Sequence, residues 1–243
     1  MTTAIFDITQ RRIGDIVTGD ARAAVVFERF GLDFCCGGRR TLEEACESAG
    51  VFAEVVIAEL AALGQPDAAD KTPDEWRELD VLAQFIRSTH HEYVKSSMPI
   101  ILQWLDRLVD RHGASHPELA KARTEFGDLS DELTGHLFKE ETILFPYIEQ
   151  MVRAARAGSH LPSGCFSSVL GPVSVMEEEH EHAGQSLVRL RALTNDYTVP
   201  QDACTTYRAC YAEMLRFDRD LRRHIHLENN ILFPGALEME QTF

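Results

Sequence analysis

A short motif that occurs twice limits what this chain can fold into. The first copy is His136-Leu-Phe-Lys-Glu140-Glu-Thr-Ile-Leu-Phe-Pro146, and the second is His224-Ile-His-Leu-Glu228-Asn-Asn-Ile-Leu-Phe-Pro234. Both copies follow the pattern H-x3-E-x2-I-L-F-P. Residues four positions apart lie one turn apart on the same face of a helix. Each copy therefore predicts a helix that directs an imidazole and a carboxylate toward one point.

A single histidine precedes each copy at a nearly constant distance. His91 lies 45 residues before His136, and His180 lies 44 residues before His224. Each unit has the length of a helical hairpin, so two units predict four helices whose facing sides gather four imidazoles and two carboxylates in a bundle core. One H-x3-E alone would more often be an ordinary amphipathic helix. Two copies with the same apolar tail and a matched upstream histidine favour metal binding.

The spacing of apolar residues indicates which histidines face the core. His180 shares a helical face with Val173, Met176, Ala183 and Leu187, whereas His182 is expected in solvent. By the same geometry, His226 points away from His224 and Glu228. The pair His90-His91 is ambiguous, because the apolar residues before it favour His90 and those after it favour His91. The matched spacing selects His91, although periodicity alone leaves both open.

Six ligands exceed the four that a structural zinc ion normally takes. They predict a dinuclear centre with two bridging carboxylates, two imidazoles on each metal ion and a shared oxo or hydroxo group. Imidazole and carboxylate without thiolate favour iron, with zinc or manganese as competitors. Glu132 and Asp220 precede His136 and His224 by four residues. They are interpreted either as acids that orient these imidazoles or as solvated helix acids.

Composition excludes several functions. The net charge of −15 argues against a nucleic-acid surface and gives no support to binding of an anionic membrane. We find no apolar run of signal-peptide or membrane-helix length. The six cysteines lack the density of a disulfide scaffold and any C-x2-C pair. A cytoplasmic protein with reduced thiols is therefore predicted.

The chain is predicted to be all-α, with no strand pattern. Residues 1–63 form a small helical module, 64–73 a linker and 74–243 an up-and-down four-helix bundle. Thr41 and Glu44 have the spacing of a capping box. Pro146 and Pro234 are expected to stop or kink the helix after each motif, because proline lacks an N–H. No role is assigned to the long connection, residues 153–171.

The motifs resemble the hemerythrin-like di-iron bundle, with its pattern His…His-x3-Glu…His…His-x3-acid. The chain departs from respiratory hemerythrin in two respects. The segment around His180 has no second histidine four residues on, and the last carboxylate is Glu228 rather than Asp. These differences argue against simple reversible oxygen carriage.

Four segments resemble the iron–sulfur cluster repair di-iron family of the YtfE/ScdA type more closely. They are Asp33-Phe-Cys-Cys-Gly-Gly38, Gly171-Pro-Val-Ser-Val-Met-Glu-Glu-Glu-His180, Ala203-Cys-Thr-Thr-Tyr207 and Leu227-Glu-Asn-Asn-Ile-Leu-Phe-Pro234. The resemblance implies two bridged iron ions, with terminal ligands His91, His136, His180 and His224 and with bridges Glu140 and Glu228. It also marks Cys35 and Cys36 as the vicinal thiol pair of the family, which is linked to recovery of bacteria from nitric oxide and peroxide stress.

Three functions follow as hypotheses. The first is repair of damaged iron–sulfur proteins by iron donation, with Cys35 and Cys36 accepting or relaying the metal. The alternative for these cysteines is a merely buried Cys-Cys-Gly-Gly turn. The second is binding of nitric oxide or O2, or a nitric oxide reductase-like enzyme that forms nitrous oxide. The third is a sensor. The expected partners include no nucleic acid and no membrane, and the protein is expected to be a monomer or a homodimer.

Overall fold

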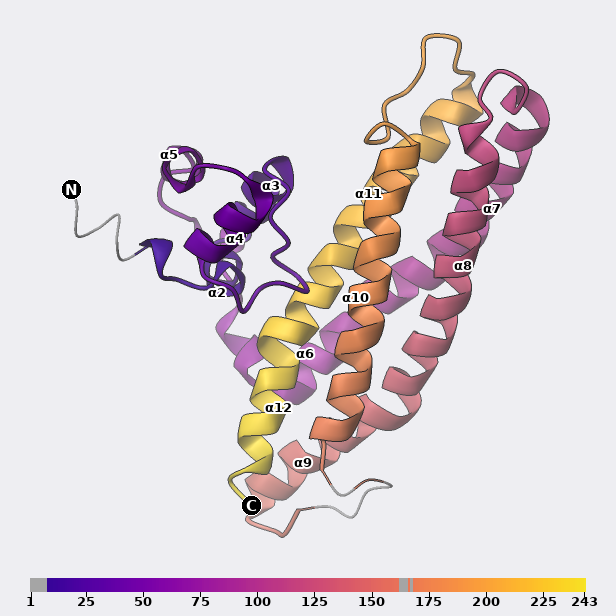
Figure 1. The fold of residues 1–243 in the computed structure, drawn as a ribbon. Coiled ribbons are helices and arrows are strands. Elements are labelled where there is room, and N and C mark those ends of the chain that lie inside the picture. Colours follow the sequence, from indigo (N-terminus) through magenta and orange to yellow (C-terminus); the bar gives the residue numbers. More distant parts are fainter. Residues whose placement is uncertain (1–7, 162–165, 167) are drawn as a thin grey trace. The chain divides into compact units, whose positions relative to one another are not determined.

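The computed structural model describes residues 8–161, 166 and 168–243, and every regular element in these residues is helical (Figure 1). This confirms the predicted all-α fold class. The elements before the bundle are α2 (Ile13–Gly19), α3 (Ala23–Arg29), α4 (Leu42–Ala49), α5 (Ala53–Ala62) and the 3₁₀ turns η1 (Ala68–Asp70) and η2 (Asp74–Arg77). The later ones are α6 (Leu79–Phe85), η3 (Ile86–His91), α7 (Glu92–His112), α8 (Glu118–Lys139), η4 (Glu140–Leu144), α9 (Phe145–Ala157), α10 (Leu170–Leu193), α11 (Thr205–Leu227), η5 (Glu228–Leu232) and α12 (Phe233–Glu240).

The chain divides into two compact units. Residues up to Leu82 form one unit together with Ile225–Thr242, and Ala83–His224 makes up the other. The second boundary falls between His224 and Ile225, inside the continuous helical stretch of α11, η5 and α12. The predicted division into 1–63, 64–73 and 74–243 stays a prediction.

The larger unit is built from α7, α8, α10 and most of α11. Helix α8 packs against both α7 and α10, and Arg191 of α10 pairs with Asp218 of α11 at 2.8 Å. Buried residues recur at alternating spacings of three and four, which is the pattern of a bundle seam. They include Val94, Met98, Ile101, Leu105 and Leu108 in α7, and Leu119, Ala122, Phe126, Leu129 and Leu133 in α8.

In the smaller unit, the short helices α2, α3, α4 and α5 surround a core of their own. Ile13, Phe27, Leu42 and Val56 are completely buried there. The predicted capping box is confirmed, because the Glu44 N–H donates to the Thr41 hydroxyl and the Thr41 N–H donates to the Glu44 carboxylate. The Asp33–Gly38 segment, which we call the thiol loop, lies between α3 and α4.

Three π-helical segments interrupt the helices at the residues that the motif singles out. Segment η3 ends at His91, η4 begins at Glu140 and η5 begins at Glu228. Pro146 and Pro234 lie in the first turns of α9 and α12, directly after η4 and η5. The expected helix stop is wrong, because the chain continues as helix past both prolines, and the expected kink stays a prediction. A widened π turn accommodates the missing N–H and the proline ring.

One predicted feature, the long connection, lies partly outside the described residues. The connection 153–171 begins as the end of α9 and finishes as the start of α10, and its residues 162–165 and 167 are not described.

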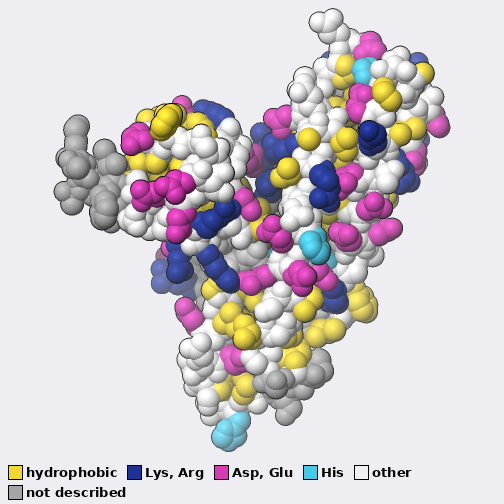
Figure 2. Space-filling model, in the orientation of Figure 1, with side chains coloured by type: hydrophobic (Ala, Val, Ile, Leu, Met, Phe, Trp, Pro, Cys, Tyr) yellow, Lys and Arg dark blue, Asp and Glu magenta, His cyan; other side chains and the backbone are white. Residues whose placement is uncertain are grey.

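Acidic side chains are spread over the face seen in Figure 2, with Lys and Arg among them.

Among the described residues, we find no helix with the length and apolar character needed to cross a membrane.

Candidate metal centre

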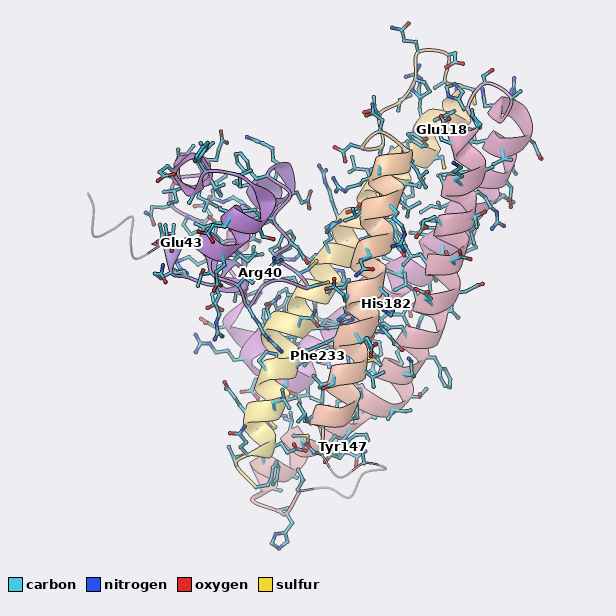
Figure 3. The ribbon with its side chains drawn as sticks, viewed as in Figure 1. Arg40, Glu43, Glu118, Tyr147, His182 and Phe233 are labelled. Carbon is cyan, nitrogen blue, oxygen red and sulfur yellow. The ribbon has the colours of Figure 1, made fainter. Side chains whose placement is uncertain are left out.

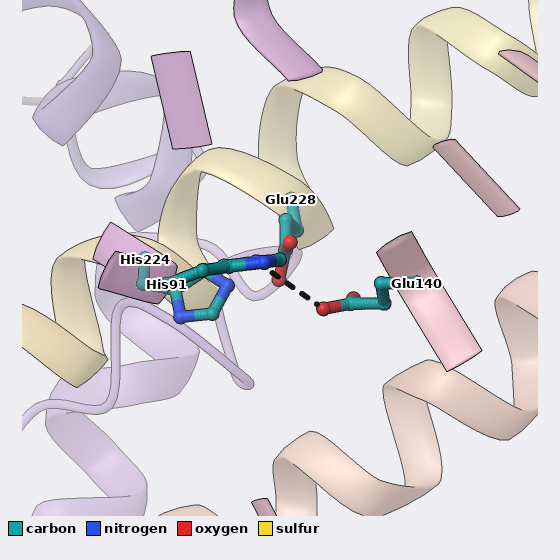
Figure 4. Close-up of side chains that lie close together, drawn as sticks. All are labelled: His91, Glu140, His224 and Glu228. Atoms are coloured by element: carbon teal, nitrogen blue, oxygen red, sulfur yellow. Dashed lines mark ion pairs between the residues drawn. The ribbon is translucent and has the colours of Figure 1, made fainter. Parts of the chain in front are cut away.

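Histidine and glutamate side chains gather in two overlapping groups. The first contains His91, Glu140, His224 and Glu228 (Figure 4). The second contains His136 and His180 with the same two glutamates. In each group, one ligand atom from every residue lies within 4.8 Å of the others. Two adjacent metal positions that share two carboxylates have this arrangement. The structure thus brings together all six residues singled out in the sequence, and their role as metal ligands stays a prediction.

Glu140 tests whether these residues fit a metal pair. Its carboxylate is completely buried and neither oxygen makes a hydrogen bond. One oxygen lies 3.5 Å from Nε2 of His91, and the other lies 3.3 Å from Nε2 of His136. A buried carboxylate without hydrogen bonds is costly unless a cation compensates its charge. One oxygen faces each imidazole group, so Glu140 fits a bridging ligand, and the donor set of imidazole and carboxylate fits iron.

The helices position these ligands as if they were core residues. His136 and Glu140 continue the buried row of α8 that contains Phe126, Leu129 and Leu133. His180 occupies the core position between Met176 and Ala183 in α10. The α11 helix that carries His224 runs on into η5, so Glu228 follows one turn later. His182 is exposed on α10, as predicted (Figure 3).

The π segment η3 explains the ambiguity between His90 and His91. A π turn contains an extra residue, so the apolar stripe shifts by one position across it. His91 is completely buried and belongs to the ligand group, as the matched spacing favoured. His90 is also buried, but its Nδ1 lies 3.0 Å from an Asp220 oxygen and its ring stacks on His224 at 5.8 Å.

Two carboxylates contact the outer nitrogens of His91 and His136, the Nδ1 atoms that point away from Glu140. Nδ1 of His91 lies 2.8 Å from Glu141, and Nδ1 of His136 lies 2.9 Å from Glu179. An Nδ1–H donated outward leaves Nε2 available as a ligand toward the centre. Lys95 pairs with Glu141, and Lys139 pairs with Glu179.

The same contacts shift the acidity of both carboxyl groups. The hydrogen bond with His136, opposed by burial and assisted by Lys139, lowers the pKa of Glu179 to about 2. Burial raises the pKa of Glu141, but the hydrogen bonds from Lys95 and His91 outweigh it and leave that pKa below its usual value. Both groups are therefore ionised at neutral pH and can accept the Nδ1–H hydrogen bonds.

The structure does not show Glu132 and Asp220 orienting His136 and His224, and for Glu132 it favours the other interpretation, a solvated helix acid. Glu132 is exposed, and the acid bonded to His136 is Glu179. The hydrogen bond made by Asp220 goes to His90 rather than to His224. An acid four residues earlier lies on the same face of its own helix, whereas the outer nitrogens of His91 and His136 face a neighbouring helix.

Sequence reasoning missed Glu141 and Glu179 as imidazole partners. Glu141 directly follows the ligand Glu140, and Glu179 directly precedes the ligand His180. A residue next to an inward-facing ligand points toward the side of its helix, where the adjacent helix packs. An acid immediately beside a ligand was therefore the available signal.

A cavity reaches the His136 and His180 group. It has a volume of about 200 Å³ and is lined by Glu132, Leu133, His136, Glu179, His180, His182 and Ala183. Its lining combines the buried ligands with the exposed side chains of Glu132 and His182. A diatomic molecule or a metal ion can therefore approach this half of the centre from solvent.

The predicted thiol pair lies in the smaller unit. Cys35 is 1 % exposed and Cys36 is half-buried, with 3.9 Å between their sulfur atoms. His226, which the helical geometry turned away from the centre, is buried in this unit too, where its ring packs edge-on against Phe34 at 5.8 Å.

Two protein-family models match this chain, one over its N-terminal part and one over most of the remainder. A family model described as the hemerythrin HHE cation-binding domain matches residues 85–236. The model ScdA_N, described as a domain of unknown function, matches residues 9–64. The chain is similar to the iron–sulfur cluster repair protein YtfE of Dickeya chrysanthemi, with 37% identity over 94% of this chain and 97% of the relative. YtfE of Yersinia pestis is 34% identical over 96% and 100% of the two chains, and that of Escherichia coli is 36% identical over 94% and 97%.

Proposed function

Because the chain belongs to the family of iron–sulfur cluster repair proteins with a hemerythrin HHE cation-binding domain, we propose that it repairs iron–sulfur clusters damaged by nitric oxide or oxidative stress. The proposed resident group is a pair of iron ions, joined by an oxo or hydroxo group and held by His91, His136, His180, His224, Glu140 and Glu228. Iron from this pair is the cargo that the damaged cluster receives.

The observation that carries this proposal is a direct link between a bridging ligand and the thiol loop. Glu228 is followed by Asn229 and Asn230, whose side-chain amides donate to the Cys35 carbonyl at 3.3 and 3.2 Å. All of these residues belong to the smaller compact unit. Thiolates bind iron well and exchange it by ligand substitution. Cys35 and Cys36 are thus suited to accept iron from the centre and pass it to a client.

The protein residues control when iron can leave. Nε2 of His91 and Nε2 of His136 must be unprotonated to hold metal, so proton uptake favours release. Glu141 and Glu179 hold the opposite nitrogen, Nδ1, in its protonated form. Lys95 and Lys139 in turn hold those carboxylates. This arrangement keeps the imidazoles oriented while the bridging carboxylates exchange partners.

A second candidate function is binding of nitric oxide, or its reduction to nitrous oxide by a nitric oxide reductase-like activity. The cavity beside His136 and His180 favours it, because a small ligand such as nitric oxide or O2 can enter there. Bound ferrous iron would supply electrons and open coordination positions for such ligands. Glu132 and His182 line the same cavity and could deliver protons.

The repair proposal defines the partners and the compartment. The clients are damaged iron–sulfur proteins, which present exposed cluster ligands to the thiol loop. Both thiols must stay reduced to accept iron, so the proposal includes a cytoplasmic location. The ligand set comes from a single chain, so a monomer or a homodimer can carry out the reaction.

The decisive experiment is reactivation of a nitric oxide-damaged iron–sulfur dehydratase. We expect the iron-loaded protein to restore activity above an equal dose of free ferrous iron. His224→Ala should abolish this gain, and Cys35→Ser/Cys36→Ser should reduce it. Recovery that is equal in wild type and His224→Ala would overturn the proposal. Nitrous oxide in the headspace of the reduced protein, without any reactivation, would support the second candidate instead.

A further inference from the structure

We propose that Asp33, Cys35 and Cys36 form a second, mononuclear metal site in the thiol loop. The site takes one divalent ion of borderline character, such as ferrous iron or zinc. This inference extends the proposed function, because it gives the relayed iron a defined binding site with a carboxylate that the motif alone did not assign. One ligand atom from each of the three residues lies within 4.8 Å of the others.

The separation of the two sulfur atoms matches metal binding. They are 3.9 Å apart. Two thiolates that bind one ion tetrahedrally with bonds of about 2.3 Å are about 3.8 Å apart. One Asp33 oxygen lies 3.2 Å from the Cys35 sulfur. A tetrahedral ion can therefore be placed among these three atoms, which all lie within 4.8 Å of one another.

The loop is folded around the Asp33 carboxylate. Its oxygens accept the backbone N–H groups of Cys35, Cys36 and Gly37 at 3.2, 3.0 and 3.1 Å. Consecutive side chains in an extended strand would point in opposite directions. Here the chain turns around the carboxylate, and both thiols lie beside it.

Two glycines permit this tight turn. A Cβ atom on Gly37 would lie 2.7 Å from the Asp33 carbonyl oxygen, and one on Gly38 would lie 2.6 Å from the Phe34 carbonyl oxygen. The guanidinium group of Arg40 packs over Gly37. Its positive charge offsets the net negative charge of a divalent ion held by two thiolates and a carboxylate. The loop thus supplies ligands, closure and charge compensation together.

The exposure of the ligands suits a transfer site. Cys35 is 1 % exposed, whereas Cys36 is only half-buried. A tetrahedral ion with three protein ligands keeps one position for water or for a client thiolate. Binding requires both thiols to lose a proton to solvent, so the site fills more readily as the pH rises. No oxidation or reduction is involved.

Cobalt(II) is the probe for this site, because cobalt thiolates absorb strongly in the near ultraviolet. We would titrate it anaerobically into the reduced full-length His136→Ala/His224→Ala protein, whose bundle centre has lost two ligands. The expected result is thiolate absorption that saturates at one equivalent. Cys35→Ser or Cys36→Ser should abolish it. Asp33→Asn should weaken cobalt binding by at least about tenfold. That is the lower limit for loss of a residue that only orients a ligand, and Asp33 is itself a proposed ligand.

Cys204→Ser is the matched control, because the Cys204 sulfur lies 3.3 Å from the His112 imidazole and offers the main competing thiolate. It should leave the titration unchanged. Three results would overturn the proposal. The thiolate absorption could be absent, it could survive in the Cys35→Ser/Cys36→Ser protein, or it could saturate at half an equivalent. If the histidine variant fails to fold by circular dichroism, the single variant His136→Ala replaces it, and only the absorption of cobalt bound to thiolate is scored. A negative cobalt result leaves the reactivation assay unaffected, so the two proposals can fail separately.

Discussion

At the scale of single residues, Glu140 places a completely buried carboxylate in the core of the bundle. Neither of its oxygens makes a hydrogen bond, and Nε2 of His91 and Nε2 of His136 lie 3.5 and 3.3 Å from them. A side chain of this kind destabilises a core that has only a structural role, whereas a bound metal ion compensates its charge.

Glu140→Gln should remove metal from the protein. The amide keeps the size of the side chain but loses the charge and one acceptor oxygen, so it cannot bridge two cations. We expect iron content after anaerobic reconstitution to fall from two ions per chain to one or none, measured by plasma mass spectrometry. His182→Ala is the control and should keep both ions. Two ions retained in Glu140→Gln would remove Glu140 from the ligand set.

Glu179→Gln should weaken iron binding while leaving all six ligands in place. It removes the carboxylate that accepts the Nδ1–H of His136 and pairs with Lys139. Loss of such an outer partner costs about 10–100-fold in metal affinity. Competition with a chelator of known affinity measures the change. Glu181→Gln, on the exposed side of the same helix, should behave like wild type, and equal affinities of all three proteins would contradict the role of Glu179.

At the scale of elements, the π segments bring the ligands into register. A regular helix through Ile86–His91 would keep the apolar stripe on His90, and the extra residue of the π turn gives that position to His91. Segment η5 combines the ligand Glu228 with the two asparagines that bond to the Cys35 carbonyl. A change in one short element therefore affects both the bundle centre and the thiol loop.

Two glycine substitutions should have opposite effects on stability. Gly38→Ala places a methyl group against Asn230 and 2.6 Å from the Phe34 carbonyl oxygen. Overpacking of this kind costs about 1–3 kcal/mol. Gly135→Ala meets no atom within 4 Å in the interior of α8. It should stabilise the protein by about 0.5–1 kcal/mol. Urea unfolding measures both, and a destabilised Gly135→Ala would contradict the helix geometry described here.

At the scale of the whole molecule, the centre couples metal binding to folding. The candidate ligands come from helices that are far apart in sequence. The two glutamates among them, Glu140 and Glu228, are buried close together. An unfolded chain cannot reproduce this arrangement, so the metal stabilises only the folded state.

Removal of iron with a chelator should lower the melting temperature. Free iron at 100 times its dissociation constant contributes about 2.7 kcal/mol, which corresponds to about 5–11 °C for a chain of this size. Differential scanning calorimetry of loaded and chelated protein measures the shift. Glu140→Gln should show little difference between the two conditions. A wild-type melting temperature that is independent of iron would show that the bundle does not need the ion.

The far end of the bundle should produce a separate pH effect. The hydrogen bond with Asp202 is the main cause that raises the pKa of His116. Burial opposes it, and the hydrogen bond with Glu118 adds to the increase. The rings of His112 and Tyr207 are its other neighbours. A raised pKa in the folded state stabilises the protein below the ordinary pKa of histidine, near 6.5, and this contribution disappears as the pH rises through the raised value.

His116→Gln should therefore lower the melting temperature at pH 5.5 more than at pH 9. Paired thermal melts of wild type and variant across this range measure the difference. The solvent exposure of Asp202 keeps the effect small and sensitive to salt. A difference that grows with pH would reverse the assigned sign.

The sequence by itself determined the helical architecture and most of the ligand set. Spacings of three and four place His136, Glu140, His180, His224 and Glu228 on inward faces, because the backbone of a single helix decides which side chains share a face. That information is local. The two eleven-residue motifs contain it for His136, Glu140, His224 and Glu228, and the apolar residues around His180 contain it for His180.

Only the tertiary structure decided the remaining features. It selected His91 through a π turn, replaced Glu132 by Glu179 as the partner of His136, and joined the Cys35 carbonyl to Asn229 and Asn230. Each of these depends on backbone register or on contacts between segments far apart in the chain. Periodicity describes one helix at a time, so it cannot show which side chain a neighbouring helix or loop presents.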